Sequence, residues 1–519
     1  MLAWEKISMY HKFCRVLSIA GFLLATGVAA NSHAQAQAPD RAARVTALLP
    51  DIDKMYIELA AKEHLPGLVY GVVLDGKLVH SRSLGLADVE RKIAATGSTE
   101  FRIASMSKSF VAMAALKLRD DGKLRLDDPV SSYLPELSRV KLPTTDSPAL
   151  TIRHLMTMAA GLPEDNPWGD RQMAISNARI EQLVSAGLSF SNAPGQTFEY
   201  SNLGYILLGK VVSKAAGMRF QDYVTRELLQ PLGMHNTRWE YTQAKPGKLA
   251  LGYRWDRDHW EAEPILPDGD GAAMGGLITT ADDFARYVAF HLDAWPARSD
   301  ADRGPVRRAS VREMHLPQAF AGMSAKATTL DGKTPNPRVS FYSYGLIVLR
   351  DSQDVVTVGH GGGLPGFGSQ YYFSPHHGVG VFAFTNLRYG PVYGRTGRAL
   401  AMLVEGADLG PGPIGVSPIL ATRYKQVAQL VQSWDADLGS KITAENFFLD
   451  RSREDWIRHA QEKLEPIGKI TSVGPISAEN SLRGSFALIG ERGKVDVKFT
   501  LTPEQEPKVQ EIALTPAKQ

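Results

Sequence analysis

Strand-like segments at both ends of a long helical middle constrain this chain most. The stretch LVYGVVLDGKLVHSRSLG (68–85) contains two strand-like runs joined by Asp75-Gly76, a strong hairpin signal. Residues 125–335 read mostly as helical segments and Pro/Gly-rich loops, and strand-like runs return between 341 and 386. Because the strands do not alternate one by one with helices, the pattern favours one antiparallel sheet with a helical insertion.

Past this second set of strands the chain changes character. GPGPIGVSP (410–418) is a linker by composition. Beyond it, Ser452 begins a capping-box pattern, and KVDVKFTL (494–501) alternates like a half-buried strand. We therefore expect a mixed α/β (α+β) domain over 39–409 and a small α+β domain over 419–519. A structural or dimerising role is the expectation for the small domain.

The N-terminus is typical of a secretory signal peptide. Basic residues precede the apolar run VLSIAGFLLATGVAA (16–30), and small-residue sites follow it. The run is shorter than the about 20 apolar residues that a spanning helix needs, and no stop-transfer charges follow. We expect residues 1–38 to be removed, leaving a bacterial periplasmic or secreted protein without a stable membrane anchor. An uncleaved anchor is the alternative.

Composition excludes several classes of function. Cys14 is the only cysteine and lies before the apolar run, so the mature chain would hold no disulfide, cysteine nucleophile or cysteine-ligated zinc. No H-x-H-x-D or H-E-x-x-H motif is present, and we expect neither a metal nor an organic cofactor. The 58 Lys and Arg residues nearly balance the 55 Asp and Glu residues without long runs of one sign, which argues against a nucleic-acid partner.

The stretch FRIASMSKSF (101–110) places Ser105 and Lys108 three residues apart, with Ser105 in the first turn of a predicted helix over 105–120. This spacing puts both side chains on one helical face, and a helix N-terminus favours a developing oxyanion. For Lys108 to accept the Ser105 proton near neutral pH, its pKa must fall about 3 units from about 10.4, or about 4 kcal/mol. Desolvation in an apolar pocket supplies such a shift.

Ser-x-x-Lys alone is a weak signal. Ser138 and Lys141 have the same spacing, but a proline and no apolar periodicity follow, so we assign that pair to a surface loop. Two further motifs accompany the first pair: Tyr-Ser-Asn (200–202) in FEYSNLGY and His-Gly-Gly (360–362) in TVGHGGGLPGF.

Ser-x-x-Lys, Tyr-x-Asn and His-x-Gly, in this order, resemble the serine β-lactamase and penicillin-binding superfamily, in its class C and esterase branch. The likeness covers roughly residues 50–405, because segments such as PLGMHNT and GGLITTADDFARYV also look like that family. The resemblance implies a β-lactamase-like fold, in which helices and an all-helical subdomain flank an antiparallel sheet.

The resemblance also implies catalytic roles. Ser105 would be the acylated nucleophile, Lys108 its proton partner and Tyr200 a general base or acid. The backbone N–H groups of Ser105 and Gly363 would form the oxyanion hole. A neighbouring ammonium would draw the Tyr200 phenol toward phenolate; the alternative is a half-buried core tyrosine.

Substrate-binding roles follow from the same resemblance. Asn202 would bind a substrate amide, although an asparagine before a helical run is also a frequent N-cap. His360, Gly361 and Gly362 would line the facing strand. β-Lactamases mostly carry lysine at the His360 position, and imidazole, with a pKa of about 6.5, is largely neutral at pH 7. A weak anchor for substrate carboxylates is the consequence.

Together these observations predict a serine hydrolase that acts on small-molecule esters, amides or lactams. An esterase or a D-amino-acid amide or peptide hydrolase is the first expectation. The alternatives are a β-lactamase or D-alanyl-D-alanine carboxypeptidase, and a penicillin-binding sensor that acylates without turnover.

Overall fold

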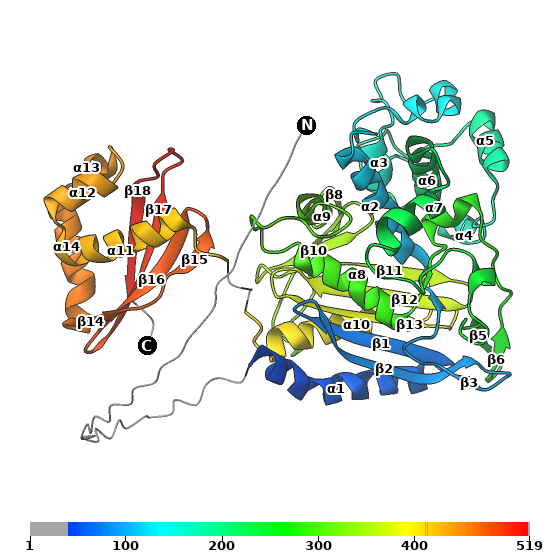
Figure 1. Cartoon of the computed structure of the whole chain (residues 1–519), viewed down its shortest axis with the longest axis horizontal. Helices are drawn as coiled ribbons and strands as arrows, with labels where there is room; N and C mark the ends of the chain where they lie inside the picture. The colour runs from blue at the N-terminus through cyan, green and yellow to red at the C-terminus, as the bar shows by residue number, and fades with distance from the viewer. Residues whose placement is uncertain (1–39, 411, 413, 517–519) are drawn as a thin grey trace, which may run out of the picture. The chain divides into compact units, whose positions relative to one another are not determined.

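A nine-stranded antiparallel sheet forms the centre of the larger folded part (Figure 1). The computed structural model describes residues 40–410, 412 and 414–516, so the predicted signal peptide lies outside the described residues. The strands are, in spatial order, β3 (Ile93–Ala94), β2 (Lys77–Asp88), β1 (Gly67–Leu74), β13 (Val379–Thr385), β12 (Phe367–Ser374), β11 (Val356–Leu364), β10 (Ile347–Asp351), β9 (Arg338–Tyr342) and β8 (Ala319–Ser324).

Strands from the two ends of the domain meet at the middle of this sheet. β1 pairs antiparallel with β13 from Leu68↔Thr385 to Leu74↔Val379. β1 and β2 form the predicted hairpin, in which both turn residues, Asp75 and Gly76, have positive φ (47° and 77°). The predicted antiparallel sheet with non-local pairing is confirmed.

Helices cover both faces of the sheet. Every residue of β1 is therefore buried. Alternate residues of β1 belong to two cores: Val69 and Val73 pack with α2 and α8, whereas Leu68 and Val72 pack with α1 and α10. Figure 1 shows α1 along one face and α8 over the other. These four helices are α1 (Arg41–Lys62), α2 (Ser107–Asp120), α8 (Ala281–Asp293) and α10 (Tyr393–Ala401).

The helical insertion lies between β4 and β7 in the sequence. The remaining helices of this domain are α3 (Ile152–Met156), α4 (Asn166–Gly169), α5 (Asn177–Ala186), α6 (Asn202–Ala216), α7 (Phe220–Val224) and α9 (Arg308–Met314). Two small two-stranded sheets pair β4 (Phe101–Arg102) with β7 (Ile278–Thr279) and β5 (Tyr253–Asp256) with β6 (His259–Ala262). Within the described ranges, no helix is long and apolar enough to cross a membrane.

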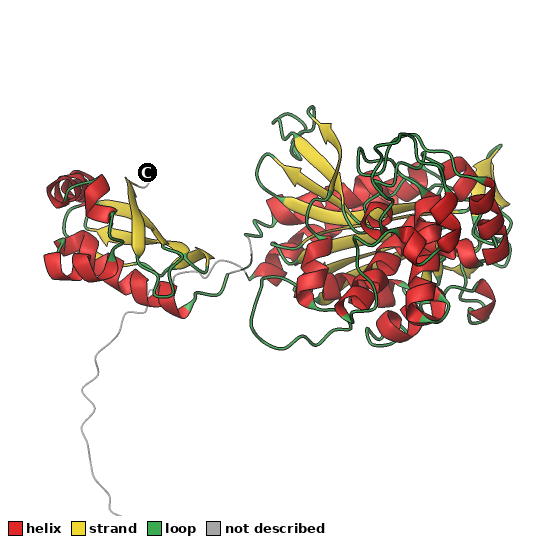
Figure 2. Ribbon diagram, turned by 90° about the horizontal axis from the view of Figure 1, so that it is seen from above, coloured by secondary structure: helices red, strands yellow, loops and turns green. Residues whose placement is uncertain are grey.

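The C-terminal part is α+β and has a core of its own, built from residues between 420 and 514. Figure 2 shows its helices gathered on one side of its strands. Val495, Val497 and Phe499 point inward from β17, and the Ser452 hydroxyl caps α14, as the sequence predicts. The elements are α11 (Pro418–Ser433), α12 (Ala436–Ile442), α13 (Phe447–Asp450), α14 (Arg453–Leu464), β14 (Ile470–Val473), β15 (Ser477–Asn480), β16 (Arg483–Gly490), β17 (Gly493–Leu501) and β18 (Val509–Pro516).

Candidate active site

The predicted nucleophile lies just before α2 rather than in its first turn. Ser105 occupies a short 3-10 turn, and Ala104 before it has φ of +48°, a left-handed conformation that residues with a Cβ rarely adopt. Two hydrogen bonds hold this turn. The Ser107 hydroxyl donates to Ala104 O at 2.7 Å, and the Ser369 hydroxyl on β12 donates to Ile103 O at 2.8 Å. Ser105 is thereby presented on a constrained turn.

Lys108 is fully buried and meets three oxygen atoms. Its Nζ lies 2.9 Å from Ser105 Oγ, 2.8 Å from Asn202 Oδ1 and 2.6 Å from the Met274 carbonyl. The carbonyl and the amide oxygen can only accept hydrogen bonds. A neutral amine has two N–H groups and one lone pair, so these acceptors would take both N–H groups. The lone pair would then face the Ser105 hydroxyl.

Burial also prepares Lys108 to be neutral. Desolvation lowers the pKa of this amine from 10.5 to about 7, and the nearby carboxylates of Asp170 and Asp165 oppose the shift without cancelling it. The shift has the size that proton transfer from Ser105 requires.

Tyr200 lines the same cleft as Ser105, and the Ser105 hydroxyl acts on its phenol. Lys108 Nζ is 4.9 Å from the centroid of its ring. The expectation that the ammonium draws Tyr200 toward phenolate is wrong, because burial and the charges of Asp170 and Asp165 raise its pKa well above the usual value. Tyr200 therefore remains a proton donor at neutral pH.

Asn202 is buried and does not line the cleft around Ser105. Its amide accepts from Lys108 and donates to Asn166 Oδ1 at 3.0 Å. The N-cap alternative is wrong by one residue, since Ser201 caps α6 by accepting from the Gly204 N–H. The amide holds Lys108 and Asn166 in place, and a substrate ligand role for Asn202 stays a prediction.

His360 is 3% exposed and fully engaged by protein atoms. Its Nδ1 donates to the Gly361 carbonyl at 2.5 Å, and Nε2 accepts from the Tyr342 hydroxyl at 3.1 Å. Burial, with a contribution from Lys108, lowers the pKa of this imidazole to about 3. His360 is therefore neutral throughout the physiological pH range, as the sequence indicated.

The glycines of β11 allow a close approach between that strand and the nucleophile turn. A Cβ on Gly362 would lie 2.3 Å from Ile103 O and 2.3 Å from Ser369 Oγ. Gly362 thus admits the turn itself, and a substrate-binding role of the β11 glycines stays a prediction.

One cleft of about 440 Å³ brings the predicted residues together. Its lining includes Ser105, Tyr200, His360, Gly361, Gly362 and Gly363. The oxyanion role of the Ser105 and Gly363 N–H groups stays a prediction. By contrast, the second Ser-x-x-Lys pair is exposed, and its Ser138 hydroxyl donates to Pro135 O instead of meeting Lys141.

Sequence reasoning missed part of this lining, namely Asn166, Asp170, Ile347 and Tyr389. The first two lie at the ends of the one-turn helix α4. That helix packs closely on α6: a Cβ on Gly169 would lie only 2.6 Å from Asn202 Cβ, so the contact requires a glycine there. The stretch DNPWGD has no spacing that marks it as part of a site, so no sequence signal would have identified these residues.

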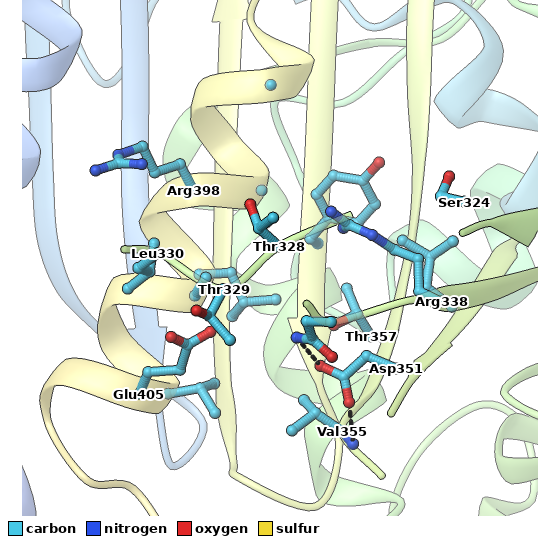
Figure 3. Close-up of a pocket in the computed structure, with 18 of the residues that line it drawn as sticks. Ser324, Thr328, Thr329, Leu330, Arg338, Asp351, Val355, Thr357, Arg398 and Glu405 are labelled. Carbon is cyan, nitrogen blue, oxygen red and sulfur yellow. Dashed lines mark hydrogen bonds between the residues drawn. The ribbon is translucent and has the colours of Figure 1, made fainter. Parts of the chain in front are cut away.

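A larger cavity of about 520 Å³ lies between α10, β9 to β12 and the loop after β8 (Figure 3). Arg338 and Arg398 line it, and Asp351 accepts hydrogen bonds there from Asn336 Nδ2 and the Val355 N–H. None of the described residues that line this cavity repeats the Ser–Lys arrangement. The chemistry therefore points to the smaller cleft.

Comparison with known proteins agrees with this geometry. Residues 52–405 match the family model described as Beta-lactamase. The chain belongs to the β-lactamase family. Its resemblance to the serine β-lactamase and penicillin-binding superfamily is thereby confirmed, together with the fold class.

Relatives of this β-lactamase-family chain carry varied descriptions. Protein flp of Staphylococcus aureus (strain N315) is 26% identical over 343 residues, which make up 65% of this chain and 62% of flp. The chain thus spans less than two thirds of the length of that relative. Beta-lactamase-like protein 2 of Dictyostelium discoideum is 31% identical over 258 residues, 48% of this chain and 47% of that protein.

Two solved structures share the fold. The octameric penicillin-binding protein homologue from Pyrococcus abyssi superposes with a TM-score of 0.58 at 20% identity, covering 91% of this chain and 96% of its own. EstCE1, described as a hydrolase with promiscuous acyltransferase activity, gives a TM-score of 0.55 at 23% identity, covering 69% of this chain and 99% of its own.

Proposed function

We propose that this protein is a serine hydrolase that forms an acyl-enzyme at Ser105, and that esters or D-amino-acid amides and peptides are its substrates. The observation that carries the proposal is the environment of Lys108. Its amine is buried, has a pKa of about 7, and has a lone pair left for the Ser105 hydroxyl.

The proposed reaction has two halves. Lys108 accepts the Ser105 proton as Oγ forms a bond to the substrate carbonyl carbon, and the N–H groups of Ser105 and Gly363 receive the oxyanion. The bond to the leaving group then breaks while Tyr200 gives that group its proton and regains one from the Lys108 ammonium. Water next attacks the acyl carbon by the same proton route, which releases the acid and restores Ser105.

The state of His360 supports esters over β-lactams that carry a carboxylate. A neutral imidazole whose two nitrogens already meet Tyr342 and Gly361 offers no cation to a substrate carboxylate. A β-lactamase or D-alanyl-D-alanine carboxypeptidase is the second candidate, because the same residues would acylate on a lactam or a D-peptide. Described relatives include both a hydrolase and a penicillin-binding protein homologue.

Two further expectations belong to this proposal. The protein would be exported, on the evidence of residues 1–38 in the sequence. The small C-terminal domain would serve a structural or dimerising role, and the match to an octameric homologue supports testing the oligomeric state.

The test compares p-nitrophenyl butyrate, nitrocefin, benzylpenicillin and a D-alanyl peptide on the mature protein, with Ser105→Ala as the control. We expect the highest kcat/KM for the ester and loss of turnover in the variant. A higher kcat/KM for benzylpenicillin than for the ester would move the protein to the lactamase branch. A burst without turnover would instead favour the sensor.

A further inference from the structure

The cleft around Ser105 is anionic. Of the described residues that line it, none is a lysine or an arginine, and His360 is neutral. The formal charge in the lining is the carboxylate of Asp170. A substrate that enters the cleft therefore meets one negative charge and no exposed positive charge.

Asp170 is built into this position. It is 7% exposed, and its Oδ2 accepts a hydrogen bond from the Tyr389 hydroxyl at 2.9 Å. Its second oxygen has no hydrogen-bond partner among the described residues and is not enclosed by the protein. Tyr389 thus orients the carboxylate and leaves one oxygen available to a ligand.

Neighbouring cations do not occupy this oxygen. Burial raises the pKa of Asp170 above its usual value, and the charges of Lys108 and Arg171 oppose this shift. Lys108 Nζ, however, is buried against three other oxygen atoms, and the Arg171 side chain is exposed and does not line the cleft. Among the described residues, the side-chain hydrogen bond to Asp170 comes from Tyr389, and Lys108 and Arg171 act on it only through their charge.

We propose that Asp170 is a specificity residue that binds a protonated amine of the substrate. The proposal rests on the function proposed for Ser105 and narrows its substrates to small esters or amides that carry an ammonium group near the reacting carbonyl. An ammonium N–H donates to a carboxylate oxygen in a short, charge-assisted hydrogen bond, whereas a substrate carboxylate is repelled. Amino-acid derivatives with a free amine fit this cleft, and N-acylated ones do not.

Binding measurements test this without relying on turnover. The ligands are glycinamide, β-alaninamide and 4-aminobutanamide, in which one, two or three carbons separate amine and carbonyl, each paired with its hydroxy analogue. Titration calorimetry at pH 7.0 uses the Ser105→Ala protein, since an α-amine has a pKa of about 7.7–8.0 and is mostly protonated there. We expect one amine to bind at least tenfold more tightly than its hydroxy partner.

The same titrations are repeated after adding Asp170→Asn or, as the matched control, Asp51→Asn, which changes an exposed aspartate on α1. Asp170→Asn should abolish the preference for the amine, and Asp51→Asn should preserve it. Equal affinities within every pair, or a preference that survives Asp170→Asn, would overturn the proposal. Hydrolysis by the Ser105→Ala protein would instead count against the proposed function and leave the affinity ratios to decide on Asp170.

Discussion

Lys108 shows how a residue's surroundings decide its chemistry. The sequence places an amine beside a hydroxyl, but the burial and the two acceptor oxygens that leave its lone pair for Ser105 come from segments distant in the chain. Burial lowers the pKa of the Lys108 amine but raises the pKa of the Tyr200 phenol, which therefore stays protonated. Sequence reasoning predicted the members of this cluster and misjudged the Tyr200 pKa, because that pKa depends on desolvation that no short motif reveals.

The pKa of Lys108 predicts a pH profile. The proposed reaction needs the neutral amine, so kcat/KM for p-nitrophenyl butyrate should rise about tenfold per pH unit below pH 7 and level off above the Lys108 pKa of about 7. Steady-state rates between pH 5 and 9 measure this limb. A profile that is flat across pH 7, or that falls as pH rises through it, would contradict Lys108 as the base.

Substitution of the base gives a second prediction at this scale. Lys108→Arg keeps a cation that does not lose its proton in this range, so kcat/KM should fall by roughly 10²–10⁴-fold, the usual contribution of a general base. Lys117→Arg is the matched control, because Lys117 lies on the same helix and forms ion pairs with Asp121 and Glu227. Equal activity of the two variants would exclude the proposed role.

At the scale of elements, the site is a contact between the turn at Ser105 and strand β11. Periodicity predicts both α2 and the strands, because their buried faces repeat regularly. It cannot predict the segment 165–170, whose one-turn helix depends on contacts with α6. The Asp165 carboxylate accepts from the backbone N–H groups of Asn202 and Leu203, a tertiary cap that the sequence pattern does not encode.

Gly362 tests this contact. In Gly362→Ala the new methyl group would lie 2.3 Å from Ile103 O, so β11 or the turn must shift. A shift of about 1 Å near the reacting groups lowers kcat by on the order of 10²-fold. Gly394→Ala on α10, whose Cβ would meet no atom within 4 Å, should leave kcat unchanged. Wild-type kcat in a folded Gly362→Ala protein would contradict the described contact.

A buried histidine pair on α8 and after α9 predicts sensitivity to acid. His291 Nδ1 and His315 Nε2 are 2.8 Å apart, and burial lowers the pKa of His291 to about 3 and also lowers that of His315 well below its usual value. Below about pH 6.5 the unfolded chain binds protons that the folded chain excludes, so the free energy of unfolding falls as pH falls. The loss between pH 6.5 and 5 should be about 2 kcal/mol per histidine.

Urea unfolding at pH 5.0, 6.5 and 7.5 measures this loss. His291→Asn removes one of the two titrating groups and should make the free energy of unfolding less dependent on pH. An unchanged dependence in that variant would show that other groups control acid unfolding.

At the scale of the whole molecule, the described residues form three hydrophobic cores, one on each face of the large sheet and one in the C-terminal part. The larger domain closes its sheet by pairing β1 with β13, so it needs nearly all of residues 52–405, the range that matches the β-lactamase family model. The strand-like runs on both sides of the helical segments predict this closure. The domain boundaries, which rest on the composition of residues 410–418, stay a prediction.

The C-terminal core contains only residues between 420 and 514. A fragment over 416–519 should therefore fold alone, with α+β circular dichroism and a single cooperative urea transition. The matched control is the same fragment with Val497→Asp, which places a charge in that core and should abolish the transition. A non-cooperative transition of the unaltered fragment would show that this domain depends on the rest of the chain.

Covalent labelling of the nucleophile tests the central claim most directly. The protein would be treated with a fluorophosphonate and digested, and the labelled peptide identified by mass spectrometry. The account predicts a single adduct on Ser105, loss of p-nitrophenyl butyrate hydrolysis in proportion to labelling, and no adduct in Ser105→Ala. An adduct on another residue, or full hydrolytic activity after Ser105 is labelled or replaced, would contradict it.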